Sequence, residues 1–168
     1  MTTVVLDELN AADRTEFAVA VGFAFEHSPW VAEAAWERRP FDSAAELLAA
    51  MTAAVDAAGR DRQLALIRAH PELATSSALT PASSSEQASA GLDRLDAGLR
   101  DRLLEATAAY GRRFGFPFVI CVREHDLDGI LAAAERRLGN QPAVEVEAAL
   151  AEIGKIAALR LDAAIEGP

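Results

Sequence analysis

The feature that most constrains the fold of this chain is the repeated placement of apolar residues at helical spacing. Blocks rich in alanine and leucine recur along the sequence, separated by residues that begin or end helices, and the alternation typical of strands is nearly absent. Hydrophobic residues make up 51% of the chain, which is enough to fill a core. The pattern predicts an all-α fold, a single-domain bundle of about eight helices over residues 1–168.

Local signals predict where the helices begin and end. Ser28 and Pro29 are a typical N-cap and first helical residue, Gly59 can end a helix, and no helix should continue through Pro71. The Ser- and Thr-rich segment 75–85 is expected to be a loop inside the domain, because helix and turn alternate similarly on both sides of it. The expected helices cover about 11–25, 29–40, 43–58, 61–69, 85–92, 96–114, 127–138 and 143–165.

One segment breaks the helical pattern. The run FGFPFVICV at 114–122 contains the helix breakers Gly115 and Pro117, followed by β-branched residues. It predicts a short, buried, extended segment over about 116–122. Without a sheet partner its peptide groups must be paired by neighbouring side chains or by a ligand. A segment that simply crosses the core is an equal alternative.

Charge and composition exclude several classes of protein. A net charge of −10 disfavours binding to nucleic acid and to anionic membranes. The single cysteine, Cys121, allows no intramolecular disulfide and no multi-cysteine metal site, and its apolar surroundings indicate a buried hydrophobic residue rather than a nucleophile. HExxH, Gly-rich phosphate loops and GxSxG are absent. We therefore expect a cytoplasmic protein without a metal, a signal peptide or a membrane span.

His70 and the residues around Glu86 are candidates for proton transfer and ligand binding. His70 ends an apolar-faced helix, so its ring is expected inside, where it serves either a structural or an acid–base role. Glu86 matches a capping box with Ser83, which is its structural alternative. Gln87 lies beside it on a short helix of small residues. The serines 83–85 would offer N–H groups to a carboxylate or a ureido oxygen.

Arg160 is the least ordinary residue of the last helix. At 100° per residue it falls within the apolar arc, whereas acidic residues such as Glu145 and Glu152 lie outside that arc. A buried guanidinium needs a partner, which could be a structural salt bridge or an anionic substrate. The arc contains Val146, Ala149, Leu150, Ile153, Ile156, Ala157 and Ala164.

Several motifs occur in one order: AHPELA, SSSEQASAGLDRL, FGFPFVICVRE and EIGKIAALRL, preceded by HSPWVAEAAWERRPF. With them the chain resembles the OHCU decarboxylase family over essentially its whole length. The resemblance implies a cofactor-free lyase that converts 2-oxo-4-hydroxy-4-carboxy-5-ureidoimidazoline (OHCU) to (S)-allantoin and carbon dioxide in urate breakdown. It also implies that the protein is a homodimer and that the molecule it binds is this small substrate.

Matched motif by motif, the resemblance implies a catalytic role for His70, Glu86 and Arg160. His70 would be the general acid/base, Glu86 would orient it or hold the substrate hydroxyl, and Arg160 would bind an anionic oxygen. A decarboxylase of a related ureido or imidazoline acid and a non-catalytic helical interaction domain are the alternatives. The implied substrate-binding residues are Pro71, Ser83, Ser84, Ser85, Gln87, Phe118, Val119, Ile120, Cys121 and Val122.

Overall fold

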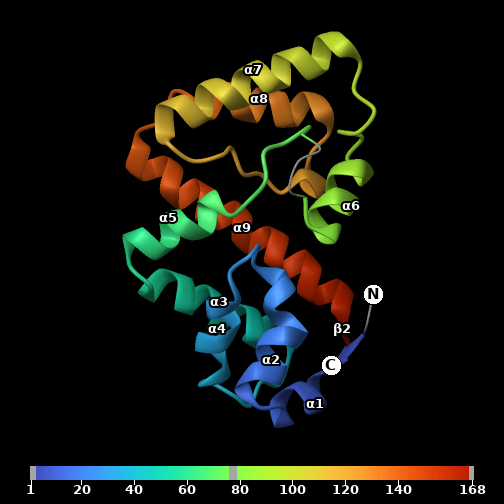
Figure 1. Ribbon diagram of the computed structural model, residues 1–168, viewed down its shortest axis with the longest axis vertical. Coiled ribbons are helices and arrows are strands. Elements are labelled where there is room, and N and C mark those ends of the chain that lie inside the picture. The colour runs from blue at the N-terminus through green and yellow to red at the C-terminus, as the bar shows by residue number, and fades with distance from the viewer. Residues whose placement is uncertain (1–2, 76–78, 167–168) are drawn as a thin grey trace. The chain divides into compact units, whose positions relative to one another are not determined.

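The computed structural model describes residues 3–75 and 79–166. Helices dominate these residues, which confirms the all-α prediction (Figure 1). Within the described residues the only strands are two-residue segments, β1 (Val4–Val5) and β2 (Ile165–Glu166), which pair in parallel. None of the helices described combines the length and apolar composition needed to cross a bilayer.

The chain divides into two compact units, each described by itself. The first contains the residues up to Ala69 and those from Gly154 onward, and the second is His70–Ile153. The single-domain arrangement over 1–168 stays a prediction. The first unit contains β1, β2, α1 (Leu6–Ala11), α2 (Arg14–Val21), η1 (Gly22–Ala24), α3 (Pro29–Trp36), α4 (Ala44–Ala57), α5 (Arg60–Arg68) and the end of α9 (Pro142–Ala164).

The start of the first unit differs from the prediction. The expected helix over 11–25 is α2 followed by the 3-10 turn η1, and the separate helix α1 precedes it. The chain is extended at Ala12, and Asp13 then starts α2 with a capping box in which its side chain accepts the N–H of Glu16. Because both halves of this box are formed, the helix begins at Arg14 rather than at 11.

Helices α4 and α5 follow their predicted ends closely, whereas α3 ends at Trp36 rather than near Pro40, and Ser28 makes no side-chain cap bond at its start. Ser43 caps α4 by accepting the N–H of Glu46 at 3.2 Å. Gly59 adopts a φ of 80°, a conformation that glycine accepts without steric cost, between α4 and α5. Helices α2 and α4 both pack against α3, with Val31 fully buried. Local sequence signals were sufficient for the ends of α4 and α5.

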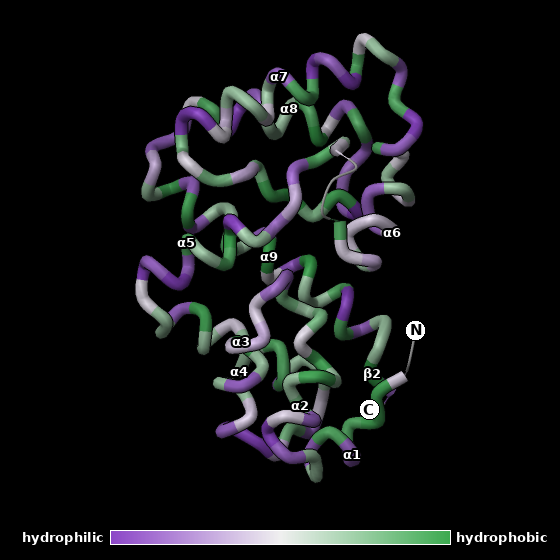
Figure 2. Tube along the Cα trace, viewed as in Figure 1, coloured by the Kyte–Doolittle hydropathy of each residue, from purple (hydrophilic) through white to green (hydrophobic). Residues whose placement is uncertain are grey.

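The second unit contains two amphipathic helices that pack against each other. Asp96 caps α7 (Ala97–Phe114), Gly115 ends it with a φ of 76°, and α7 packs against α8 (Leu127–Arg137). Figure 2 shows hydrophilic and hydrophobic residues following one another along α7, as expected of a helix with one buried face. The elements of this unit are α6 (Pro81–Ser89), α7 (Ala97–Phe114), η2 (Val122–Glu124), α8 (Leu127–Arg137) and α9 up to Ile153.

The prediction for α6 was wrong at its start. The helix begins at Pro81 rather than near 85, because the Thr80 side chain accepts the N–H of Ser83 at 3.2 Å and acts as N-cap. The expected loop 75–85 is therefore helical from Pro81 onward, and its residues 76–78 lie outside the described residues.

Candidate active site

His70 lies where α5 has just ended and the second unit begins. Its side chain is buried, with the residue only 6% exposed and no exposed surface on Nε2. Ala69 is the C-cap of α5, and Pro71 follows the histidine, so the chain leaves the helix at this point. The prediction that the ring enters the interior is confirmed.

The residues of α6 divide between its two faces. Ser83 and Gln87, one turn apart, are buried, whereas Ser84 and Ser85 are exposed and Glu86 is half-buried. The predicted capping box of Ser83 and Glu86 is wrong, because Thr80 occupies the N-cap position and Ser83 is already inside the helix. A purely structural role for Glu86, as the partner of Ser83 in a capping box, is therefore not supported.

Gln87 has a structural task in this unit. Its Oε1 atom accepts the N–H of Ala74 at 3.1 Å, and Ala74 itself has a φ of 57°. The Arg100 guanidinium donates to the carbonyl of the same residue at 2.9 Å. These two bonds fix the chain just after the His70-Pro71 step, in a conformation that residues other than glycine rarely adopt.

A cleft of about 710 Å³ lies beside α6 in this unit. Ser84 and Gln87 are the predicted site residues among those that line it. His70 and Glu86 do not line it, so the cleft by itself does not gather the predicted catalytic residues. Its lining comprises Ala74, Thr75, Leu79, Thr80, Pro81, Ser84, Gln87, Ala88, Leu92, Asp93 and Arg100.

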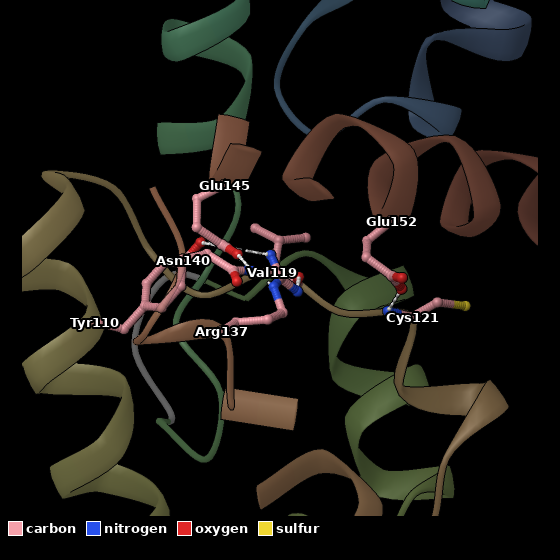
Figure 3. A network of polar contacts seen from close by, with 7 residues as sticks. All are labelled: Tyr110, Val119, Cys121, Arg137, Asn140, Glu145 and Glu152. Carbon is pink, nitrogen blue, oxygen red and sulfur yellow. Dashed lines mark hydrogen bonds and ion pairs between the residues drawn. The ribbon is translucent and has the colours of Figure 1, made fainter. Parts of the chain in front are cut away.

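The predicted extended run is buried and has neither helix nor strand up to Cys121. The 3-10 turn η2 begins at Val122, so the extended segment ends at Cys121, one residue before its predicted end; η2 packs against α6. Two of the run's peptide groups are paired by side chains, which is one of the two ways of pairing that the sequence predicted. Arg137 donates to the Val119 carbonyl at 2.8 Å, and the Cys121 N–H donates to Glu152 at 2.8 Å (Figure 3).

Behind this run lies a buried polar network that the sequence reasoning missed (Figure 3). Glu145 is 0% exposed, although the helical arc placed it on the polar face. Its Oε2 accepts the Nε of Arg137 at 3.0 Å and also the Tyr110 hydroxyl, while its Oε1 accepts the Asn140 amide at 2.7 Å. The carboxylate is buried because three donors from neighbouring elements replace water around it.

A sequence signal for this network existed. Arg137 follows Ile130 and Ala134 at spacings of seven and three residues, so it continues the buried stripe of α8 in the same way as Arg160 does in α9. Burial, followed by the hydrogen bond to Glu145, raises the pKa of Tyr110. The phenol therefore stays a neutral donor to the carboxylate.

Cys121 fits the prediction of a buried hydrophobic residue. It is 1% exposed, and burial, followed by the charges of Glu124 and Glu152, raises the pKa of its thiol. The charge of Glu86 acts on the pKa of the thiol in the same direction. A thiol in this setting is a poor nucleophile.

Arg160 is buried, as predicted, with an exposed fraction of 4%. Its Nη1 donates to Glu26 Oε2 at 2.8 Å and to the Phe23 carbonyl at 3.1 Å, all within the first unit. The structural ion pair that stood as the alternative for this residue is thus present. The sequence reasoning did not identify Glu26, although an acidic residue between Phe25 and His27 in an apolar stretch was a visible signal.

Three side chains could hold a cation. Glu124, His125 and Glu152 place one potential ligand atom each within 4.8 Å of one another. Imidazole and carboxylate are ligands that divalent metals accept, but carboxylates commonly gather at surfaces without an ion. The expectation of a metal-free protein stays a prediction.

Comparisons with known proteins agree on one family. A family model described as OHCU decarboxylase matches residues 10–162. The 2-oxo-4-hydroxy-4-carboxy-5-ureidoimidazoline decarboxylase of Haloferax volcanii is 45% identical over 96% of this chain and 96% of its own length.

Two solved structures are similar to this chain. A crystal structure of (S)-allantoin synthase has a TM-score of 0.79 and 30% identity, over 96% of this chain but 54% of that one, so the match spans about half of that protein. A crystal structure of OHCU decarboxylase in the presence of (S)-allantoin has a TM-score of 0.70 and 27% identity, over 90% of this chain and 97% of that one.

Proposed function

This chain belongs to the OHCU decarboxylase family, and we propose that it is a lyase that decarboxylates OHCU to (S)-allantoin and carbon dioxide in urate degradation. The observation that carries the proposal is the 45% identity with a relative named for this activity, over 96% of both chains. Similarity of that extent covers both units rather than an isolated motif.

The chemistry of the substrate accounts for a protein without a cofactor. The carboxylate to be lost is attached to a ring carbon next to a C=N bond, so the electron pair released with carbon dioxide can move into the ring. The protein must orient the substrate, exclude water and deliver a proton to one face of the ring. Loss of activity on dialysis against EDTA would contradict this proposal.

In this proposal His70 is the general acid/base. Its burial supports the role, because a ring with little solvent contact exchanges protons with a bound ligand more readily than with bulk water. Glu86 would orient the ring or hold the substrate hydroxyl. It lies half-buried on α6 and, with Thr80 as N-cap, is not needed to cap the helix.

Arg160 would bind an anionic oxygen of the substrate. The ion pair with Glu26 supports a fixed orientation of the guanidinium, since one of its nitrogens is held at 2.8 Å from the carboxylate. Glu26 would then be a positioning residue for Arg160. A guanidinium presents its N–H donors in a fixed planar fork, which matches the geometry of a carboxylate.

Optical activity tests the proposed reaction. Freshly prepared OHCU decays spontaneously to racemic allantoin, so the protein should produce a rapid excess of the (S) form. An unchanged racemic course would refute the activity and favour a related ureido acid or a non-catalytic role.

Variants test the proposed residues. His70→Asn should abolish formation of (S)-allantoin while the far-UV circular dichroism stays native. The matched control is His27→Asn, since His27 is exposed and its φ of 46° suits asparagine. Arg160→Met should raise KM strongly or abolish kcat. Near-normal turnover in either variant would remove that residue from the mechanism.

We further propose a cytoplasmic homodimer. The single cysteine fits a reducing compartment, and the apolar helices supply surface for self-association. Light scattering coupled to size-exclusion chromatography should give twice the 17.8 kDa of one chain, and a monomer would contradict the proposal.

A further inference from the structure

We propose that Arg137 and Glu152 are positioning residues for substrate binding, because they clamp the two peptide groups on either side of Ile120. The inference deepens the proposed function and rests on it, since the clamped segment is part of the run proposed to contact OHCU. Glu152 is the first residue of the motif EIGKIAALRL, but the resemblance assigned a role to neither side chain.

The geometry of the peptide bond gives the clamp its effect. Arg137 binds the Val119 carbonyl, which shares a planar peptide group with the Ile120 N–H. Glu152 binds the Cys121 N–H, which shares the next planar group with the Ile120 carbonyl. In a trans peptide the C=O and N–H point in opposite directions, so each bond of 2.8 Å also aims a group of Ile120 away from its clamp.

The groups so aimed belong to a buried residue. Ile120 is 4% exposed, and its N–H and C=O form no hydrogen bond with any part of the chain that the structure describes. Buried peptide groups are nearly always paired, with protein, water or ligand. A substrate group that carries both a donor and an acceptor, such as a ureido or a ring amide, could pair with both at once.

Arg137 is itself held in place, which makes it a rigid clamp. Its Nε and Nη2 both lie 3.0 Å from Glu145 Oε2, and only Nη1 is directed to the Val119 carbonyl. The same carboxylate accepts the hydroxyl of Tyr110, and the guanidinium lies 4.7 Å above the ring of Phe118. A lysine has no fixed fork and cannot bind Glu145 and the carbonyl in this manner.

The two clamps come from different elements of the second unit. Arg137 is the last residue of α8, and Glu152 lies on the part of α9 that belongs to this unit. Glu152 is half-buried and stands outside the Glu145 network, so its replacement should leave that network intact. It therefore provides the cleaner test.

The experiment measures KM and kcat for OHCU, with the dissociation constant of (S)-allantoin measured by calorimetry. In Glu152→Ala the Cys121 N–H loses its acceptor, and KM and the dissociation constant should both rise about tenfold while kcat changes little. Glu152→Gln keeps a carbonyl acceptor and should restore most of the affinity. Asp162→Ala removes an exposed acid from the same helix and should behave as wild type.

Arg137→Lys should show the same rise in KM, provided that circular dichroism shows a native fold. If this variant does not fold, Glu152→Ala decides the matter. Unchanged KM in the folded variants, or a fall in kcat at constant KM such as partial unfolding produces, would overturn the inference. An inactive wild-type protein would instead refute the proposed function, so the two failures are distinguishable.

Discussion

Replacing Glu26 by alanine is expected to destabilise the protein strongly, because it removes the counter-charge of a buried cation. The Nη1 of Arg160 lies 2.8 Å from Glu26 Oε2, and the two side chains are 4% and 1% exposed. In Glu26→Ala the guanidinium stays buried without that carboxylate. Its lost hydration is then no longer offset by the Glu26 carboxylate.

The expected magnitude follows from this burial. Removing one partner of a buried ion pair costs about 3–5 kcal/mol of unfolding free energy. At roughly 2–4 °C per kcal/mol for a chain of this size, Tm should fall by about 6–20 °C. The double variant Glu26→Met with Arg160→Met should lie closer to wild type, since an apolar pair leaves no buried charge.

An exposed ion pair supplies the matched control. Arg14 and Glu37 are 3.9 Å apart with side chains 53% and 61% exposed, so Glu37→Ala should cost less than about 1 kcal/mol. Urea unfolding at 25 °C can be followed by tryptophan fluorescence, because both tryptophans, Trp30 and Trp36, lie on α3 in the same unit. Equal losses in Glu26→Ala and Glu37→Ala would refute the reasoning.

Three further predictions follow from single side chains. Tyr110 is the only tyrosine, and because its pKa is raised in the native state, the unfolded state ionises first as pH passes 10. At pH 11 the protein in urea should show phenolate absorbance at 295 nm, whereas the native protein should show none. The free energy of unfolding should fall by roughly 1.4 kcal/mol per pH unit above 10, and less steeply in Tyr110→Phe. A native phenolate signal at that pH would contradict its burial. The Cys121 thiol should react with iodoacetamide at pH 8 at least about 100-fold more slowly in the native protein than in urea, and equal rates would show that it is exposed. Thr80→Ala should lower the free energy of unfolding by about 1 kcal/mol, because it removes the N-cap bond of α6. Replacement of the exposed Ser84 by alanine should change it by less than about 0.5 kcal/mol. A larger loss in Ser84→Ala than in Thr80→Ala would contradict Thr80 as the N-cap.

Most of the helices could be predicted because their ends depend on neighbouring residues. Ser43 and Asp96 cap helices through side-chain bonds to amides three residues ahead, and Gly115 ends one through its left-handed backbone. The errors also arose locally. At α6 two caps competed, and Thr80 followed by Pro81 starts the helix earlier than Ser83 would.

The candidate site was predictable in part. The burial of His70 and Arg160 follows from helical periodicity, which places a polar residue on an apolar face and so marks it as unusual. The same periodicity placed Glu145 on the exposed face, and this was wrong. A helical wheel describes one helix in isolation and contains no information about which donors a neighbouring element brings to its polar side.

The sequence by itself thus determined the helical class, most helix ends, the buried extended run and the two unusual buried residues, because these depend on interactions within a few positions of the chain. Only the tertiary structure decided the partners. Glu26 meets Arg160 across 134 positions, and Arg137 meets the Val119 carbonyl across 18. Such pairs form where packing excludes water and brings a charged side chain against a partner from a distant part of the chain, which no local pattern specifies.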